Sequence, residues 1–199
     1  PSGWYRVSQT IKLKPNTVLI GLSPIGTQFI LANNTESFGS FGGPKAVRES
    51  AKGGANILSG IGLSTNADNP RAVACKWMAG ARSCMNDVKF IGGHGSMERI
   101  WKQPQQAPER NYSANGVDPA WDTQYWSLWV TDGGGGVFKD IWTANTYASA
   151  GVYISNTSTP GRIYALSVEH HVRNEIRFNK VANWKVYALQ LEEESRDGT

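Results

Sequence analysis

The residues most able to do chemistry lie between Ser167 and Glu194, a segment with two of the chain's three histidines and five of its 16 acidic residues. Apolar and polar residues alternate here, which predicts two strands that each turn one polar row outward. The outward residues are Ser167, Glu169 and His171 on the first strand and Gln190, Glu192 and Glu194 on the second. Neighbouring strands would then present carboxylates to one surface, where they can act as acid and base.

Hydrolysis of a glycosidic bond is a reaction that uses such carboxylates. An acid protonates the leaving oxygen, and a nucleophile or a base-activated water attacks the sugar. Glu192 is followed by Glu193 and Glu194, and nearby negative charge favours the protonated form of a carboxyl group. From residue types alone, however, three glutamates near a terminus are more typical of a solvated charge run.

The same segment resembles the catalytic stretch of glycoside hydrolase family 55, the β-1,3-glucanases (laminarinases) of the pectate-lyase-like β-helix superfamily. The V-E-H-H pattern is matched by residues 168–171, and Q-x-E by residues 190–192. The resemblance implies that Glu192 is the general acid and that Glu169 is a second acidic residue of the cleft. For Glu192, it outweighs the interpretation as a charge run.

Family members are longer and place the cleft between two tandem β-helices, with the attacking water held by the second helix. This chain has sequence for one helix. We therefore expect residues 1–199 to be a single, partial β-helix domain, whose cleft a second copy or a missing domain would complete. No residue here matches the water-holding positions, so the water-activating group stays open.

Several further side chains are candidates for holding a sugar. Gln190 would hydrogen-bond a hydroxyl, Glu194 would extend the polar row, and His171 would contact the sugar or Glu169. Tryptophan rings stack on pyranose faces, and the candidates are Trp126 and Trp129, with Trp142 and Trp184 as further possibilities. Asp132 and Asp140 are possible second carboxylates.

No metal or other cofactor is expected. His170 and His171 are adjacent, and adjacent strand residues point to opposite faces, so the two imidazoles should not share one metal ion. We expect His170 to be packed in a structural role and His94 to lie in a Gly-rich turn. The two cysteines, Cys75 and Cys84, are either small buried residues or a disulfide.

Short strands recur along the chain and predict the fold. One unit contains Ile61, the next contains Val88, 27 residues later, and a third contains Ile141, 53 residues further on. The first interval lies within the range of about 20–45 residues that is typical of stacked repeats, and the second suggests a long insertion. Residues 174–178 and 183–187 were expected to continue the series.

These repeats predict an all-β fold, a single-stranded right-handed parallel β-helix with long surface loops. An antiparallel β-sandwich is the main rival, but the short hairpin turns of a meander are missing. Residues 96–121 should form a surface insertion. Residues 33–54 should form a polar loop with one helical turn near residues 45–50, and residues 133–136 a tight turn.

Composition and charge limit the kinds of molecule that the protein is expected to bind. Net charge is +4, but the basic residues are scattered, so nucleic acid is not expected. No apolar run approaches the ~20 residues that span a bilayer. Sequons at Asn33, Asn111 and Asn156 weakly indicate a secreted protein.

The leading hypothesis is hydrolysis of β-1,3-glucan with inversion, with a polysaccharide or oligosaccharide as substrate. A non-catalytic glycan-binding or structural β-helix is the second hypothesis, and a polysaccharide lyase is the third. A lyase would usually need a cluster of carboxylates that binds Ca²⁺, and no such cluster stands out in the sequence.

Overall fold

The computed structural model describes residues 2–39, 42–66, 68–92, 124–145, 148–171 and 174–192. These residues are mostly strand, with one short helix, α1 (Glu36–Gly39). Every strand pair in the two sheets is parallel. The predicted all-β class is confirmed, and the antiparallel sandwich is wrong. No helix among the described residues is long and apolar enough to cross a membrane.

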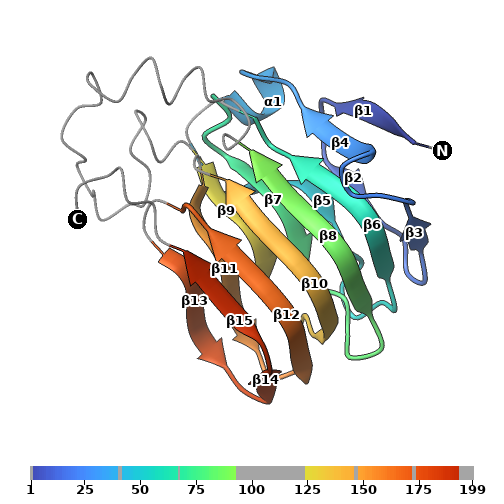
Figure 1. The fold of residues 1–199 in the computed structure, drawn as a ribbon, viewed down its shortest axis with the longest axis vertical. Helices are drawn as coiled ribbons and strands as arrows, with labels where there is room; N and C mark the ends of the chain where they lie inside the picture. The colour runs from blue at the N-terminus through green and yellow to red at the C-terminus, as the bar shows by residue number, and fades with distance from the viewer. Residues whose placement is uncertain are drawn as a thin grey trace.

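The strands form two sheets that face one another as two layers (Figure 1). The first sheet contains β1 (Gly3–Val7), β3 (Val18–Ile20), β4 (Thr27–Leu31), β6 (Ile57–Ser64), β8 (Cys84–Gly92), β10 (Gly136–Asn145), β12 (Gly161–Glu169), β14 (Trp184–Val186) and β15 (Leu189–Glu192). The second contains β2 (Ile11–Lys12), β5 (Lys45–Glu49), β7 (Ala72–Trp77), β9 (Gln124–Val130), β11 (Ala148–Thr157) and β13 (Asn174–Val181). The chain alternates between them: it leaves one sheet, forms a strand in the other, and returns to add the next strand to the first.

The register confirms the repeat that the sequence predicted. Ile61 pairs with Val88, and Val88 pairs with Ile141. The next partner of Ile141 is Leu166 on β12. Residues 174–178, expected to continue this row, instead belong to β13 in the second sheet. Strands of both sheets alternate in the same way, so periodicity alone could not tell the two rows apart.

The helical turn expected near residues 45–50 is wrong, because this segment is strand β5, with parallel neighbours β2 and β7. Pairing on both sides buries Ala46, Val47 and Arg48, which overrides a weak local preference for helix. The helical turn that does form is α1, which begins at Glu36, nine residues before the start of β5. The turn expected at residues 133–136 lies between β9 and β10, as predicted.

The core fills the space between the sheets. Its members come from both layers and include Leu58, Ile61, Val88 and Phe90 from the first sheet and Leu128, Val152 and Ile154 from the second. Cys75 is buried in this core, and burial raises the pKa of its thiol to about 12. Cys84 is only half-buried, and both cysteines are free, so the disulfide alternative is wrong.

A row of left-handed residues crosses the middle of the first sheet. Gly60, Asp87, Asp140 and Ala165 have φ values of 62°, 48°, 52° and 59°, and they occupy equivalent positions between paired residues of β6, β8, β10 and β12. A residue of this kind interrupts pairing and bends the strand. Since the interruptions are aligned, the sheet is bent along one line instead of at scattered points.

A glycine on β11 shows how tightly the layers pack. A Cβ atom at Gly151 would lie 2.2 Å from Val168 Cγ1 and 2.6 Å from Thr143 Oγ1, whereas one at Gly43 would meet nothing within 4 Å. We expect Gly151→Ala to lower the free energy of unfolding by about 1–3 kcal/mol, because overpacking displaces neighbours. Gly43→Ala should change it by less than about 0.5 kcal/mol. Urea denaturation of both variants measures this, and equal midpoints would contradict the packing described.

Candidate functional site

Pairing between β12 and β15 builds the site. Ser167 pairs with Gln190, and Glu169 pairs with Glu192. The prediction that two neighbouring strands present carboxylates to one surface is therefore confirmed. Leu189 and Leu191 align with buried residues of β12, but they are 45% and 53% exposed, because only β12 pairs with β15 in the part of the chain that the structure describes.

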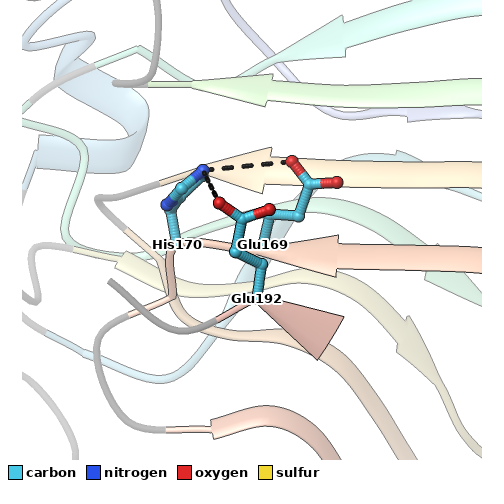
Figure 2. Close-up of side chains that lie close together, drawn as sticks. All are labelled: Glu169, His170 and Glu192. Atoms are coloured by element: carbon cyan, nitrogen blue, oxygen red, sulfur yellow. Dashed lines mark ion pairs between the residues drawn. The ribbon is translucent and has the colours of Figure 1, made fainter. Parts of the chain in front are cut away.

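Two glutamates and a histidine converge at the ends of these strands (Figure 2). His170 Nε2 lies 3.9 Å from Glu169 Oε2 and 3.8 Å from Glu192 Oε1. One ligand atom from each of the three residues lies within 4.8 Å of the other two, a grouping that could hold a metal ion. Glu169 and His170 are mostly buried, while Glu192 is 54% exposed and forms the open side.

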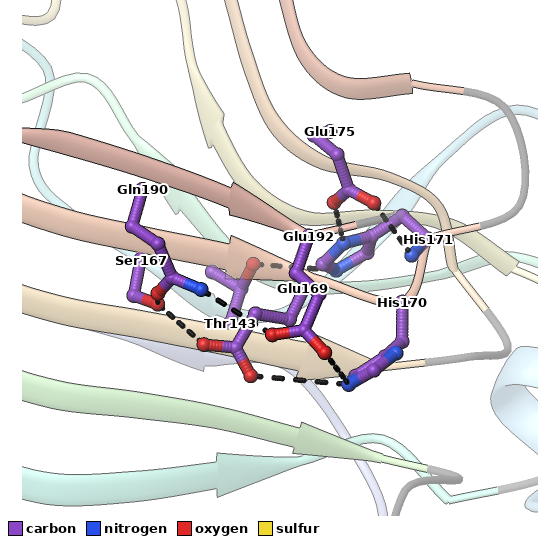
Figure 3. A network of polar contacts seen from close by, with 8 residues as sticks. All are labelled: Thr143, Ser167, Glu169, His170, His171, Glu175, Gln190 and Glu192. Atoms are coloured by element: carbon purple, nitrogen blue, oxygen red, sulfur yellow. Dashed lines mark hydrogen bonds and ion pairs between the residues drawn. The ribbon is translucent and has the colours of Figure 1, made fainter. Parts of the chain in front are cut away.

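A second layer of hydrogen bonds fixes the outer oxygen of each carboxylate (Figure 3). The Ser167 hydroxyl lies 2.5 Å from Glu169 Oε1 and also contacts the side-chain oxygen of Gln190. Gln190 Nε2 donates to Glu192 Oε2 across 3.3 Å. Each carboxylate therefore turns its other oxygen toward His170. Gln190 was predicted to serve this face, but the part played by Ser167 was not foreseen.

His170 is mostly buried, which agrees with the structural role expected for it, but its ring lies in the carboxylate cluster, a contact that the sequence did not predict. His170 has φ = 62°, which ends the strand alternation directly after Glu169. The imidazole consequently turns to the same side as Glu169, and the backbone N–H of His170 donates to the Glu192 carbonyl across 2.9 Å. A positive φ at a non-glycine residue cannot be read from alternation, so the contact of His170 with the carboxylates could not be predicted from the sequence.

His171 does not point outward as predicted; it is buried between the layers. Its Nδ1 lies 2.6 Å from Glu175 Oε2, and its Nε2 lies 3.2 Å from Thr143 Oγ1. A neutral imidazole with its proton on Nδ1 satisfies both contacts. Burial lowers the pKa of His171, although the hydrogen bond to Glu175 opposes this shift. His171 is therefore a structural residue that anchors the chain beneath the cluster.

A groove of about 490 Å³ follows the bend of the first sheet next to the cluster. Its lining includes Lys89, Asp140, Trp142, Ala165, Ser167 and Gln190. The left-handed residues Asp140 and Ala165 lie along it, so the bend of the strands hollows this face. Ser167 and Gln190 join the groove to the two carboxylates.

The structure does not bring Trp126 and Trp129 to this groove. Both lie on β9 in the second sheet, where their ring centroids are 4.8 Å apart and Trp126 also contacts Tyr153. Trp142, on β10, is the candidate tryptophan that lines the groove. The many aromatic residues around residue 126 suggested a sugar-binding surface. Successive strands of the chain go to different sheets, however, and β9 lies in the second sheet, away from the groove.

Other candidates are separated from the cluster or lie elsewhere. Asp132 pairs with Lys76 across 3.1 Å, and Trp184 packs against Phe138 at the core. Glu194, His94 and the insertion at residues 96–121 lie outside the described residues. Lys89 was not predicted, although the 53-residue spacing that aligns Val88 with Ile141 also aligns Lys89 with Trp142.

Comparison with known proteins adds no further assignment: no protein-family model matches the chain, and no curated protein is significantly similar to it. The resemblance to glycoside hydrolase family 55 therefore depends on residues 168–171 and 190–192.

Burial of a neutral His171 predicts a pH dependence of stability. Below about pH 6.5 the unfolded chain takes up a proton that the folded chain resists, so the free energy of unfolding falls as pH decreases, by at most ~1.4 kcal/mol per pH unit from this residue. Glu175 and Thr143 contact the ring, and the charges of Glu175, His170 and Glu169 act on its pKa. His171→Gln should flatten the dependence between about pH 6.5 and 5.5, while His170→Gln keeps it. Unfolding in urea at several pH values measures this, and an unchanged slope in His171→Gln would refute it.

Proposed function

We propose that this protein is a carbohydrate-active enzyme that hydrolyses β-1,3-glucan with inversion, with Glu192 as general acid. The observation that carries the proposal is an exposed carboxyl group, Glu192, held by Gln190 beside a groove of about 490 Å³. This volume lies within the range of about 300–1,000 Å³ that is typical of ligand pockets. Exposed asparagines in the sequons at Asn33 and Asn156 are compatible with a secreted protein acting on an external polysaccharide.

We further propose that the two sheets are faces of one right-handed, single-stranded parallel β-helix. Three features support this: strands alternate between the sheets, all pairs are parallel, and the row of left-handed residues divides the first sheet into two flat parts. β14 and β15 pair with the two halves of β12, as β3 and β4 do with β6. Such a coil resembles the fold of glycoside hydrolase family 55.

The surroundings of Glu192 suit an acid that works at a groove wall. Its Oε2 is fixed by Gln190, and it is the most exposed member of its cluster. Proton donation to a glycosidic oxygen requires a carboxyl group that a substrate can reach. In this proposal Trp142 stacks on a pyranose face and Gln190 contacts a hydroxyl, so the scissile bond lies toward Glu192.

Glu169 is too close to Glu192 to be the base of an inverting pair. Inverting carboxyl groups are about 6.5–9.5 Å apart, which leaves room for water, whereas the nearest carboxylate atoms here lie within 4.8 Å. We therefore assign Glu169 to positioning the cluster. Asp140 is the carboxylate that lines the groove itself, but it lies four residues before Ala144, the β10 partner of Glu169, which is too far from Glu192 for an inverting pair. We therefore assign no residue to the activation of water.

A non-catalytic glycan-binding protein is the second candidate. The short separation of Glu169 and Glu192 favours it, because these two carboxylates alone leave no place for an attacking water. In that case the groove would bind laminari-oligosaccharides and release no product after long incubation. The two candidates therefore differ in the appearance of glucose, not in binding.

Laminarin hydrolysis tests the enzymatic proposal. Glu192→Gln should lower kcat by about 10²-fold or more, since it removes the proton donor. The matched control is Asp132→Asn, whose carboxylate pairs with Lys76 at the end of the second sheet and should leave hydrolysis unchanged. Proton NMR of the wild-type reaction should detect the α-anomer first. Undiminished glucose release by Glu192→Gln would exclude it as the acid.

The position of the tryptophans yields a separate prediction about binding. Trp142→Ala should raise KM for laminari-oligosaccharides about tenfold, because one stacked ring contributes on the order of 1 kcal/mol. Trp129→Ala removes a half-buried ring of the second sheet and should leave KM unchanged. Steady-state kinetics, or calorimetric titration in the Glu192→Gln background, measures both. A larger effect of Trp129→Ala would place the sugar on the other layer.

A further inference from the structure

We propose that Glu169, His170 and Glu192 form a three-ligand site for a first-row transition metal ion such as Zn²⁺. The ligand atoms would be Glu169 Oε2, Glu192 Oε1 and His170 Nε2, which already converge (Figure 2). Metal binding itself does not depend on the proposed function. Its consequence does: an ion held there withdraws Glu192 from acid catalysis.

The distances are those of a site that needs only a small contraction. Zn²⁺ binds nitrogen and carboxylate oxygen at about 2.0–2.2 Å, which places ligand atoms about 3.3–3.6 Å apart in a tetrahedron. His170 Nε2 is 3.9 Å and 3.8 Å from the two oxygens. Rotation of the exposed Glu192 side chain would close much of the remaining gap.

The second layer of hydrogen bonds is arranged as metal sites require. Groups that hydrogen-bond to ligating side chains orient them and are commonly found around bound ions. Ser167 holds Glu169 Oε1 and Gln190 holds Glu192 Oε2, so each carboxylate directs its other oxygen at the imidazole. Hydrogen bonds from Ser167 and Gln190 therefore preorganise the two carboxylate ligand atoms around the imidazole (Figure 3).

The backbone contributes a further constraint. A left-handed conformation is unfavourable at a non-glycine residue, and strained residues of this kind concentrate at binding sites. Here φ = 62° at His170 turns the ring toward the glutamates. The hydrogen bond from His170 N to Glu192 O, 2.9 Å long, joins the two strands at this point.

Ligand chemistry selects the class of metal ion. Ca²⁺ and Mg²⁺ prefer oxygen ligands alone, whereas one imidazole with two carboxylates suits Zn²⁺ and its neighbours in the first row. Three protein ligands leave a fourth position for water or a sugar hydroxyl. Binding requires both carboxylates to be deprotonated, which is why the ion and an acidic Glu192 exclude one another.

Isothermal titration of the untagged full chain with ZnCl₂ tests the site directly. The wild type should bind one ion that His170→Gln and Glu192→Gln each abolish or weaken by more than tenfold. Ser167→Ala keeps all three ligands but removes the hydrogen bond that orients Glu169, and it should weaken binding by about tenfold. Asp132→Asn, a carboxylate variant distant from these residues in the register, should bind as the wild type does. Titration with MgCl₂ should give no comparable heat.

Co²⁺ absorption spectra provide the second readout, because band positions report nitrogen and oxygen ligation. A spectrum that His170→Gln changes supports the site. Zn²⁺ affinity that is the same in wild type, His170→Gln and Glu192→Gln, each folded by circular dichroism, overturns it. If Zn²⁺ binds as described and the metal-free protein does not hydrolyse laminarin, the proposed function fails while the site stands. If laminarin is hydrolysed and Zn²⁺ does not bind, the reverse holds.

Discussion

Everything at the candidate site depends on the register between β12 and β15. In a parallel pair, a shift of one residue would turn every side chain of β15 to the other face. Leu189 and Leu191 would then leave the positions of Leu166 and Val168, and Glu192 would no longer lie beside Glu169. The pairing of β15 with β12 thus determines which carboxylates meet, although β15 itself gains little burial.

Left-handed backbone positions give this sheet its functional shape. The aligned row through Asp140 and Ala165 hollows the outer face into a groove. His170, also left-handed, turns an imidazole toward the carboxylates at the end of the same strand. His171 then points inward, where Glu175 and Thr143 satisfy both of its nitrogens. One change of backbone conformation therefore places His170 in the carboxylate cluster and His171 between the two sheets.

Much of this arrangement could be predicted from alternation and spacing. The pairing of Val88 with Ile61 and with Ile141 follows from the spacing of period-two patterns, as does the outward row of Glu169 and Glu192. The roles of His170 and His171 could not be predicted, because a positive φ at a non-glycine residue leaves no periodic signal. The layer that carries Trp126 could not be predicted either, since strands of both sheets alternate alike and only three-dimensional pairing assigns them.

The most direct test of the account is a crystal structure of the Glu192→Gln variant with a laminari-oligosaccharide. The account predicts a sugar in the groove, with one pyranose stacked on Trp142 and a glycosidic oxygen within hydrogen-bonding distance of residue 192. A sugar bound against Trp126 and Trp129 on the second sheet, or an empty groove at saturating oligosaccharide, would contradict it.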